Sequence, residues 1–254
     1  MMNIYRCFAI LLGGLFLSST VLGNDHAAGS RNGTMAHANL CYLKEGKSMS
    51  DVDSLNKEFF AFLKDRDLAP LSVILTPVAT STRTSQPPYD FIEMMFAEHS
   101  RIGQMWDAIL ESERGQKILA GWSAMTDCVT SFSSLLHKFQ DADGQARTDS
   151  RVVEFNRCES HPAAWGQLGQ KHDEMLANRG ADATNIYWGL LLPETGSSGG
   201  WFRHLIAYPN MTAYTEAVAA RNNAEYRGRM RDYNQNWAQC DGLSVWAGRV
   251  QNRP

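Results

Sequence analysis

The sequence has no excess of basic residues: 24 Lys and Arg stand against 27 Asp and Glu, and the formal net charge is −3. Proteins that bind nucleic acid, or a membrane surface through anionic lipid, carry clustered positive charge that meets phosphate. We therefore expect neither partner for this chain.

Motifs that hold metals or phosphates are also missing. The cysteines do not have the short paired spacing of zinc ligands. Gly46-Lys47-Ser48 lacks the upstream glycine of a phosphate-binding loop. We expect no metal and no cofactor.

Long apolar runs are absent except at the N-terminus. Arg6 is followed by the apolar residues 8–17 and then by small residues up to Gly23. This order is typical of a cleavable secretory signal, and the run is shorter than the roughly 20 residues of a membrane span. We expect a signal peptide over residues 1–23, a periplasmic or secreted protein, and no membrane contact after cleavage. Residues 24–37 are small and polar, which predicts a flexible lead-in where His26 and His37 are too isolated for a metal site.

Cysteine is scarce, and its placement indicates a repeat. Cys7 lies in the leader, which leaves four cysteines, an even number that favours disulfides in an exported protein. Cys41 and Cys128 enclose almost the same length of chain as Cys158 and Cys240.

The same events follow each leading cysteine in the same order. An apolar helix stripe comes first, with identical spacing in both copies. Next come an apolar strand ending in proline, a third strand, a second helix and a last strand. The two helix stripes are Val52, Leu55, Phe59, Phe62 and Leu63 in the first copy, and Trp165, Leu168, His172, Met175 and Leu176 in the second. The second strands end at Pro77 and Pro193, and the third strands cover 90–96 and 201–207. The second helices begin near Ser100 and Asn210, and the last strands cover 129–136 and 243–250.

Two ferredoxin-like units are therefore expected. With first strands near residues 37–42 and 152–157, both copies have the order β-α-β-β-α-β. We place the first unit at 38–140, a polar linker at 141–150 and the second unit at 151–252. The alternative to an internal repeat is chance, because the two halves of any α+β chain can be aligned loosely with each other.

The topology predicts the disulfides. In a ferredoxin-like unit the first and fourth strands are antiparallel neighbours about 4.8 Å apart. Cys41 and Cys158 lie at the ends of the first strands, and Cys128 and Cys240 lie at the starts of the fourth strands. A disulfide joins Cα atoms about 5.5–6 Å apart, so we expect Cys41–Cys128 and Cys158–Cys240.

Tandem units of this order, with the opening Cys41-Tyr42-Leu43-Lys44-Glu45-Gly46-Lys47-Ser48, resemble exported bacterial proteins of the dimeric α+β barrel superfamily. The resemblance implies two sheets that pair face to face inside a layer of helices, here within one chain, and hence a monomer. The superfamily includes cofactor-free monooxygenases, haem-degrading enzymes, haem peroxidases and simple binding proteins. The resemblance therefore does not choose a chemistry.

Glu93 and His204 are the candidate catalytic residues. They hold corresponding positions in the third strands, between apolar neighbours. If they face the lumen, an acid and a base meet there and can transfer a proton. The alternative is an exposed edge or a structural hydrogen bond.

Aromatic residues supply candidate ligand-lining positions: Trp188, Trp201, Phe202 and Phe91. His172 is expected on the outer face of the sheet, as a core residue rather than a haem ligand.

Three functions remain open. The first is binding of a small, mostly apolar molecule between the two sheets. The second is a cofactor-independent enzyme of the monooxygenase or isomerase type. The third is a structural or interaction protein whose lumen is filled by side chains.

Overall fold

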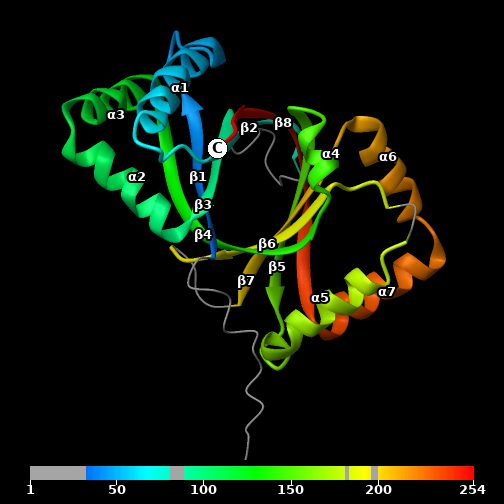
Figure 1. Cartoon of the computed structure of the whole chain (residues 1–254). Helices are drawn as coiled ribbons and strands as arrows, with labels where there is room; N and C mark the ends of the chain where they lie inside the picture. Colours follow the sequence, from blue (N-terminus) through cyan, green and yellow to red (C-terminus); the bar gives the residue numbers. More distant parts are fainter. Residues whose placement is uncertain (1–32, 81–88, 181–182, 196–199) are drawn as a thin grey trace, which may run out of the picture.

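The computed structural model describes residues 33–80, 89–180, 183–195 and 200–254, so the expected signal peptide lies outside the described residues. Eight antiparallel strands form a closed barrel in the order β1-β3-β2-β8-β5-β7-β6-β4 (Figure 1). The α+β barrel is thus confirmed. The strands are β1 (Thr34–Leu43), β2 (Leu71–Thr80), β3 (Phe91–Glu98), β4 (Thr126–Gln140), β5 (Ser150–Ser160), β6 (Tyr187–Pro193), β7 (Trp201–Tyr208) and β8 (Ala238–Asn252).

Strands β1–β4 form the first half of the barrel and β5–β8 the second. The spatial order is β4-β1-β3-β2 in the first half and β8-β5-β7-β6 in the second. The halves join where β2 pairs with β8 and β4 pairs with β6. Every strand edge is therefore paired within the chain.

Helices cover the outside of the barrel in two separate layers (Figure 1). One layer lies over the first half, the other over the second, and the short α4 lies near one end of the barrel. The first layer holds α1 (Met49–Lys64), α2 (His99–Glu111) and α3 (Glu113–Met125), the second holds α5 (Leu168–Ala177), α6 (Met211–Ala220) and α7 (Ala224–Asn236), and α4 is Ala142–Ala146.

Side chains alternate between the lumen and the helices, because successive strand residues point to opposite faces. The lumen holds one apolar cluster drawn from all eight strands. Separate clusters lie beneath the helices of each half. The main lumen residues are Ala36, Val73, Leu75, Ile92, Met94, Leu135, Val153, Tyr187, Leu191, Leu205, Ala207 and Trp246.

Several expected boundaries in the first half were wrong. β1 begins at Thr34, so residues 34–37 belong to the sheet and not to a lead-in. α1 begins at Met49 after its N-cap Ser48, whose backbone N–H donates to Asp51. Pro77 does not end β2: a register shift beside it accommodates its missing N–H.

The second half departs from expectation at two places. Its first long helix, α5, starts at Leu168, and Trp165 in the preceding turn is 46% exposed rather than part of the buried stripe. The expected linker contains α4 and the first residue of β5. Asn210 caps α6 by accepting from the Ala213 N–H, as expected.

Both predicted disulfides are present, Cys41–Cys128 and Cys158–Cys240. In each pair the two cysteines are direct register partners of the first and last strands of a half. Within the described residues, no helix is long and apolar enough to cross a membrane.

We predict that peptide mapping without reduction recovers these two pairs. Each disulfide closes a loop of more than 80 residues, with separations of 87 and 82. Removing either pair as a double Cys→Ala variant should cost about 2–5 kcal/mol of unfolding free energy in chemical denaturation. A Cys128–Cys158 link would contradict the barrel topology.

Candidate functional site

Glu93 and His204 do not meet in the lumen. Ile92 and Met94 point into the barrel, so Glu93 between them points toward the helices of the first half. Leu205 takes the lumen position beside His204, which points toward the helices of the second half. The expected acid–base pair across the barrel was wrong, because the strand alternation gives the lumen to their apolar neighbours.

Three of the four residues expected to line a ligand site are on the helix-covered face, while Trp201 shares its side of β7 with the lumen residue Leu205. Phe91 packs with Trp122 of α3, and Phe202 and Trp188 pack against His172 of α5. Trp201 lies at the start of β7 under the guanidinium of Arg157, 3.7 Å from the ring centroid. The cluster in the lumen is mainly aliphatic, with Tyr187 and Trp246 as its buried aromatic residues.

His172 and His204 form a buried cluster in the second half, in which Nδ1 of His172 has no hydrogen-bond partner among the described residues. The Tyr233 hydroxyl lies 2.8 Å from Nε2 of His172 and 3.4 Å from Nε2 of His204. Trp188 donates its indole N–H to Nδ1 of His204, at 3.1 Å. Burial lowers the pKa of His204 to about 4 and that of His172 to about 2, the latter also through His204. Both imidazoles are therefore neutral near pH 7, as hydrogen-bonded core residues.

The disulfide of the second half lies beside this cluster. Potential ligand atoms of Cys158, His204 and Cys240 all fall within 4.8 Å of one another. A metal needs deprotonated thiolates, but here the two sulfurs are bonded to each other. The arrangement as it stands offers one histidine and no thiolate.

The first half has a cavity beside its buried polar residues. It has a volume of about 210 Å³ and lies between the sheet and the helices α2 and α3. Ser123 and Thr130 stand at its exposed rim. We call it the first-half pocket. Its apolar wall is Phe59, Met95, Met105, Ile109, Ile118, Leu119 and Trp122, and its polar lining includes His37, Asn39, Glu93 and Trp106.

Glu93 is the buried acid of this pocket. It pairs in register with Asn39 of β1 and is 1% exposed. Burial raises its pKa to about 7, although the nearby side chains of Asn39, Asn56 and Ser72 act to lower it. A carboxyl group with a pKa near neutrality both accepts and releases a proton easily.

His37 lies on the same face of β1 as Asn39, beside Glu93. Its ring stacks on Phe132 at 5.0 Å and meets the edge of Trp106 at 5.4 Å. Burial lowers its pKa to about 4, although the nearby Asn39 side chain acts to raise it. The ring is therefore neutral at pH 7, with one N–H donor and one acceptor nitrogen.

Three groups on the pocket wall lack hydrogen-bond partners. Among the described residues, none bonds Oε1 of Glu93, either ring nitrogen of His37 or the indole N–H of Trp106. Asn56 and Ser72, close behind Glu93, are likewise unbonded. Buried polar atoms are paired in the great majority of cases, so these groups are available to the polar atoms of water or of a ligand.

The sequence analysis missed this pocket because its residues are far apart in the chain. His37 was set aside as isolated, while its neighbours come from β3, α2 and β4. One signal was available: His37, Asn39 and Cys41 share one side of a strand whose other side is Ala36, Ala38 and Leu40.

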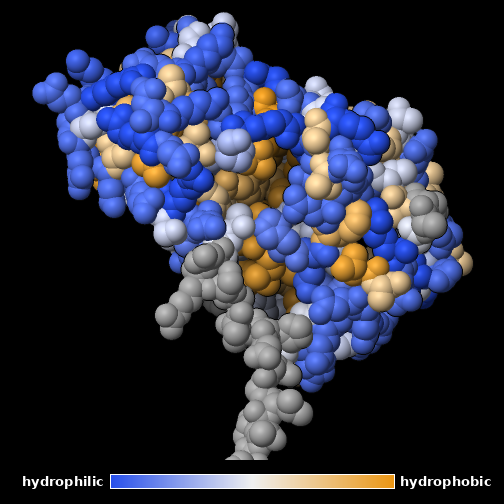
Figure 2. All heavy atoms as spheres, viewed as in Figure 1, coloured by the Kyte–Doolittle hydropathy of each residue, from blue (hydrophilic) through white to orange (hydrophobic). Residues whose placement is uncertain are grey.

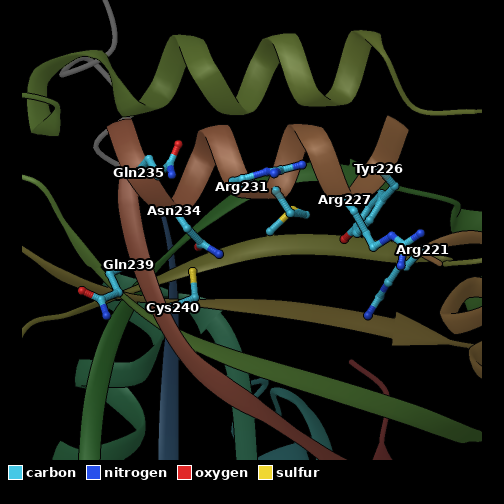
Figure 3. Close-up of a pocket in the computed structure, with 9 residues that line it drawn as sticks. Arg221, Tyr226, Arg227, Arg231, Asn234, Gln235, Gln239 and Cys240 are labelled. Carbon is cyan, nitrogen blue, oxygen red and sulfur yellow. The ribbon is translucent and has the colours of Figure 1, made fainter. Parts of the chain in front are cut away.

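A second depression runs along α7, between that helix and β8 (Figure 3). It has a volume of about 610 Å³ and is lined by Arg227, Arg231 and other polar side chains. None of its described lining residues has a buried polar atom without a partner. It is an open, solvated surface rather than a prepared site.

No family model and no curated protein matches this sequence. Solved structures do show the same fold. A proposed monooxygenase from Fusobacterium nucleatum subsp. nucleatum is similar over 87% of this chain and 94% of its own, with a TM-score of 0.59 and 7% identity. A proposed monooxygenase from Lactobacillus acidophilus NCFM covers 87% and 95%, with a TM-score of 0.57 and 8% identity. An anthrone oxidase-like protein covers 89% and 95%, with a TM-score of 0.50 and 9% identity. The chain thus has the ferredoxin-like α+β barrel fold, and identities this low show the fold alone.

Proposed function

We propose that the protein binds a small, mostly apolar molecule in the first-half pocket and that Glu93 moves a proton to or from it. The observation that carries this proposal is the group of three unpartnered polar side chains, Glu93, His37 and Trp106, on one apolar cavity. The sequence analysis placed such a molecule between the two sheets. The polar groups suited to orient it lie between a sheet and its helices.

The chemistry follows from the three groups. The Glu93 carboxylate accepts a proton from an acidic O–H, or from a C–H beside a carbonyl. The negative charge left on the substrate oxygen then receives hydrogen bonds from the N–H groups of His37 and Trp106. Isomerisation and cofactor-independent oxygenation by molecular oxygen both begin with such a step, and the proposed monooxygenases of the same fold support an enzyme of this class.

The corresponding position of the second half has a different hydrogen-bond environment. In register, Ile74 lies opposite Glu93 and Leu190 lies opposite His204. Two residues earlier in these strands the first half has Ser72, and the second half has Trp188, whose indole bonds His204. His204 therefore accepts a hydrogen bond from the neighbouring strand, whereas Oε1 of Glu93 has no bond from the described residues.

We also infer that the chain is a tandem duplication, is exported and acts as a monomer. The shared strand order of the halves and the matching disulfide positions support duplication. The two disulfides support export to an oxidising compartment. The closed barrel leaves no unpaired strand edge for a second copy.

The raised pKa of Glu93 predicts a pH-dependent stability that Glu93→Gln removes. Between its ordinary pKa of 4.5 and about 7, the unfolded chain releases this proton while the folded chain keeps it. Stability therefore falls as pH rises through this range, and the full penalty of about 3 kcal/mol is present above pH 7. In denaturant titrations from about pH 4.5 to about pH 8, the variant should equal wild type at the acid end and exceed it by that amount at the alkaline end.

Glu58→Gln is the matched control, since Glu58 is an exposed carboxylate on α1. It should track wild type at every pH. The three buried histidines are present in wild type and in both variants, so their contributions cancel when the unfolding free energies are subtracted. An equal stability gap between Glu93→Gln and wild type at both ends of the range would show that folding does not raise the pKa of Glu93.

Binding and proton transfer can be tested with 2-naphthol, a planar apolar molecule with one acidic hydroxyl. The pocket of about 210 Å³ is larger than the roughly 150 Å³ cavity that holds benzene. Above pH 7, where Glu93 is ionised, bound naphthol should emit as the naphtholate because the carboxylate takes its proton on excitation. Glu93→Gln should bind naphthol and emit as the neutral form.

His37→Phe tests the anion-binding part of the site. The phenyl ring should stack on Phe132 and keep or raise thermal stability, because it removes two unbonded nitrogens. Naphthol affinity should fall about tenfold, while that for naphthalene, which has no hydroxyl, should not fall. Naphthol binding no tighter than naphthalene binding, or naphtholate emission that persists in Glu93→Gln, would remove the pocket from consideration.

A further inference from the structure

The barrel lumen contains a separate, smaller cavity. Its volume is about 110 Å³, and most of its wall is aliphatic. In the space-filling view, apolar atoms gather in a hollow between the two helical layers, where the barrel lies (Figure 2). The wall includes Val73, Leu75, Met94, Leu135, Val153 and Leu205.

A glycine helps to keep this space open. Gly248 of β8 has no side chain, and a Cβ there would lie 3.1 Å from Cδ2 of Leu75 and 3.3 Å from Cγ2 of Val153. A larger residue at this position would fill the lumen between those two walls.

Arg151 is an unpaired cation in the lining of this cavity. It stands two residues before Val153 on β5, hence on the lumen face, and is 8% exposed. Its Nη2 donates to the Gln145 carbonyl at 2.8 Å, but its Nε has no hydrogen-bond partner in the described chain. Asp149 is nearby, yet its carboxylate pairs with Arg253 at 2.8 Å.

Arginine is almost never buried without a partner anion, and an unpaired buried charge is strongly destabilising. None of the ion pairs in the described residues includes Arg151. The end of the cavity around it is otherwise polar: the Tyr187 hydroxyl lies 2.9 Å from Nδ1 of His137, and Gln140 and Gln145 complete the lining. The cavity therefore joins an apolar wall to one cationic, hydrogen-bonding end.

We propose that the lumen binds a small monocarboxylate, with its carboxylate on Arg151 and its short apolar chain among the aliphatic side chains. This second site is independent of the first-half pocket. An arginine fork matches a carboxylate in charge and geometry. Since a cavity of about 150 Å³ holds the six carbons of benzene, this smaller one fits an apolar chain of about four or five carbons.

The test is calorimetric titration with hexanoate and hexan-1-ol, which share a chain and differ in the head group. Wild type should bind hexanoate about 10- to 100-fold more tightly than hexan-1-ol. Arg151→Met keeps the length of the side chain and removes its charge. It should lose that preference while keeping hexan-1-ol binding, with thermal stability equal to or above wild type because the unpaired charge is gone.

Arg147→Met is the matched control, an exposed arginine on the segment just before β5. It should leave the preference for hexanoate unchanged. Gly248→Val should weaken both ligands by filling the wall, and Glu93→Gln should weaken neither, which separates this site from the proposed function. Should Arg151→Met fail to fold, Arg151→Lys keeps the charge without the fork and should bind hexanoate more weakly than wild type.

Equal affinity of wild type for hexanoate and hexan-1-ol, or no hexanoate binding at all, would overturn the proposal. So would an unchanged preference in a folded Arg151→Met or Arg151→Lys variant.

Discussion

Closure of the barrel is the constraint on which the rest of the structure depends. Once both edges of each half are paired, each strand has one side toward the lumen and one side toward the outside, where helices cover its central part. A polar side chain on a central strand position is then buried whichever way it points. Glu93, His37, His204 and Arg151 are all less than a tenth exposed for this reason. Burial in this fold therefore shifts the pKa values of these titratable residues. Each of them needs a polar partner from the protein or from a ligand.

The two halves meet this requirement differently. In the second half Tyr233 and Trp188 hydrogen-bond His204, and Arg221 pairs with the buried Glu154 at 2.7 Å. Glu154 and His37 occupy corresponding positions, four residues before the leading cysteine of each half. The first half gives His37 aromatic neighbours and leaves space beside it. Nδ1 of His172 also lacks a partner among the described residues, so the halves differ mainly in their buried acids. Glu154 is paired with Arg221, whereas Glu93 belongs to none of the ion pairs of the described residues.

Local patterns predicted the topology well and the orientation of the site poorly. The cysteine spacing and the helix stripes follow from covalent geometry and from the 3.6-residue period, so the strand order and both disulfides could be read from them. Period-2 alternation says that Glu93 shares a face with Phe91 and Met95, but not which face the helices cover. Both faces of β3 are apolar, since a barrel wall under helices is buried on both sides. The sequence therefore left the face of Glu93 open, and the hypothesis that it faces the lumen was wrong. The pocket around His37 depends on contacts between β1, β3 and α2 that no local pattern contains.

The unpartnered groups are costs that packing alone would have removed. Replacing a buried polar group and its partner by apolar ones of similar shape is often neutral or stabilising. A chain under selection for stability alone would therefore place an apolar side chain at residue 93 and at residue 151, as it does at the neighbouring positions Ile92 and Val152. Glu93 instead lines a cavity between the sheet and the helices, and Arg151 lines a smaller, more apolar cavity within the barrel. The free-energy cost of burying an unpaired polar group beside a cavity is offset when a ligand with a complementary polar group binds in that cavity. The acid of the first-half pocket suits a proton donor, and the cation of the lumen suits an anion. For this reason the two cavities argue for two different ligands rather than for one defect repeated.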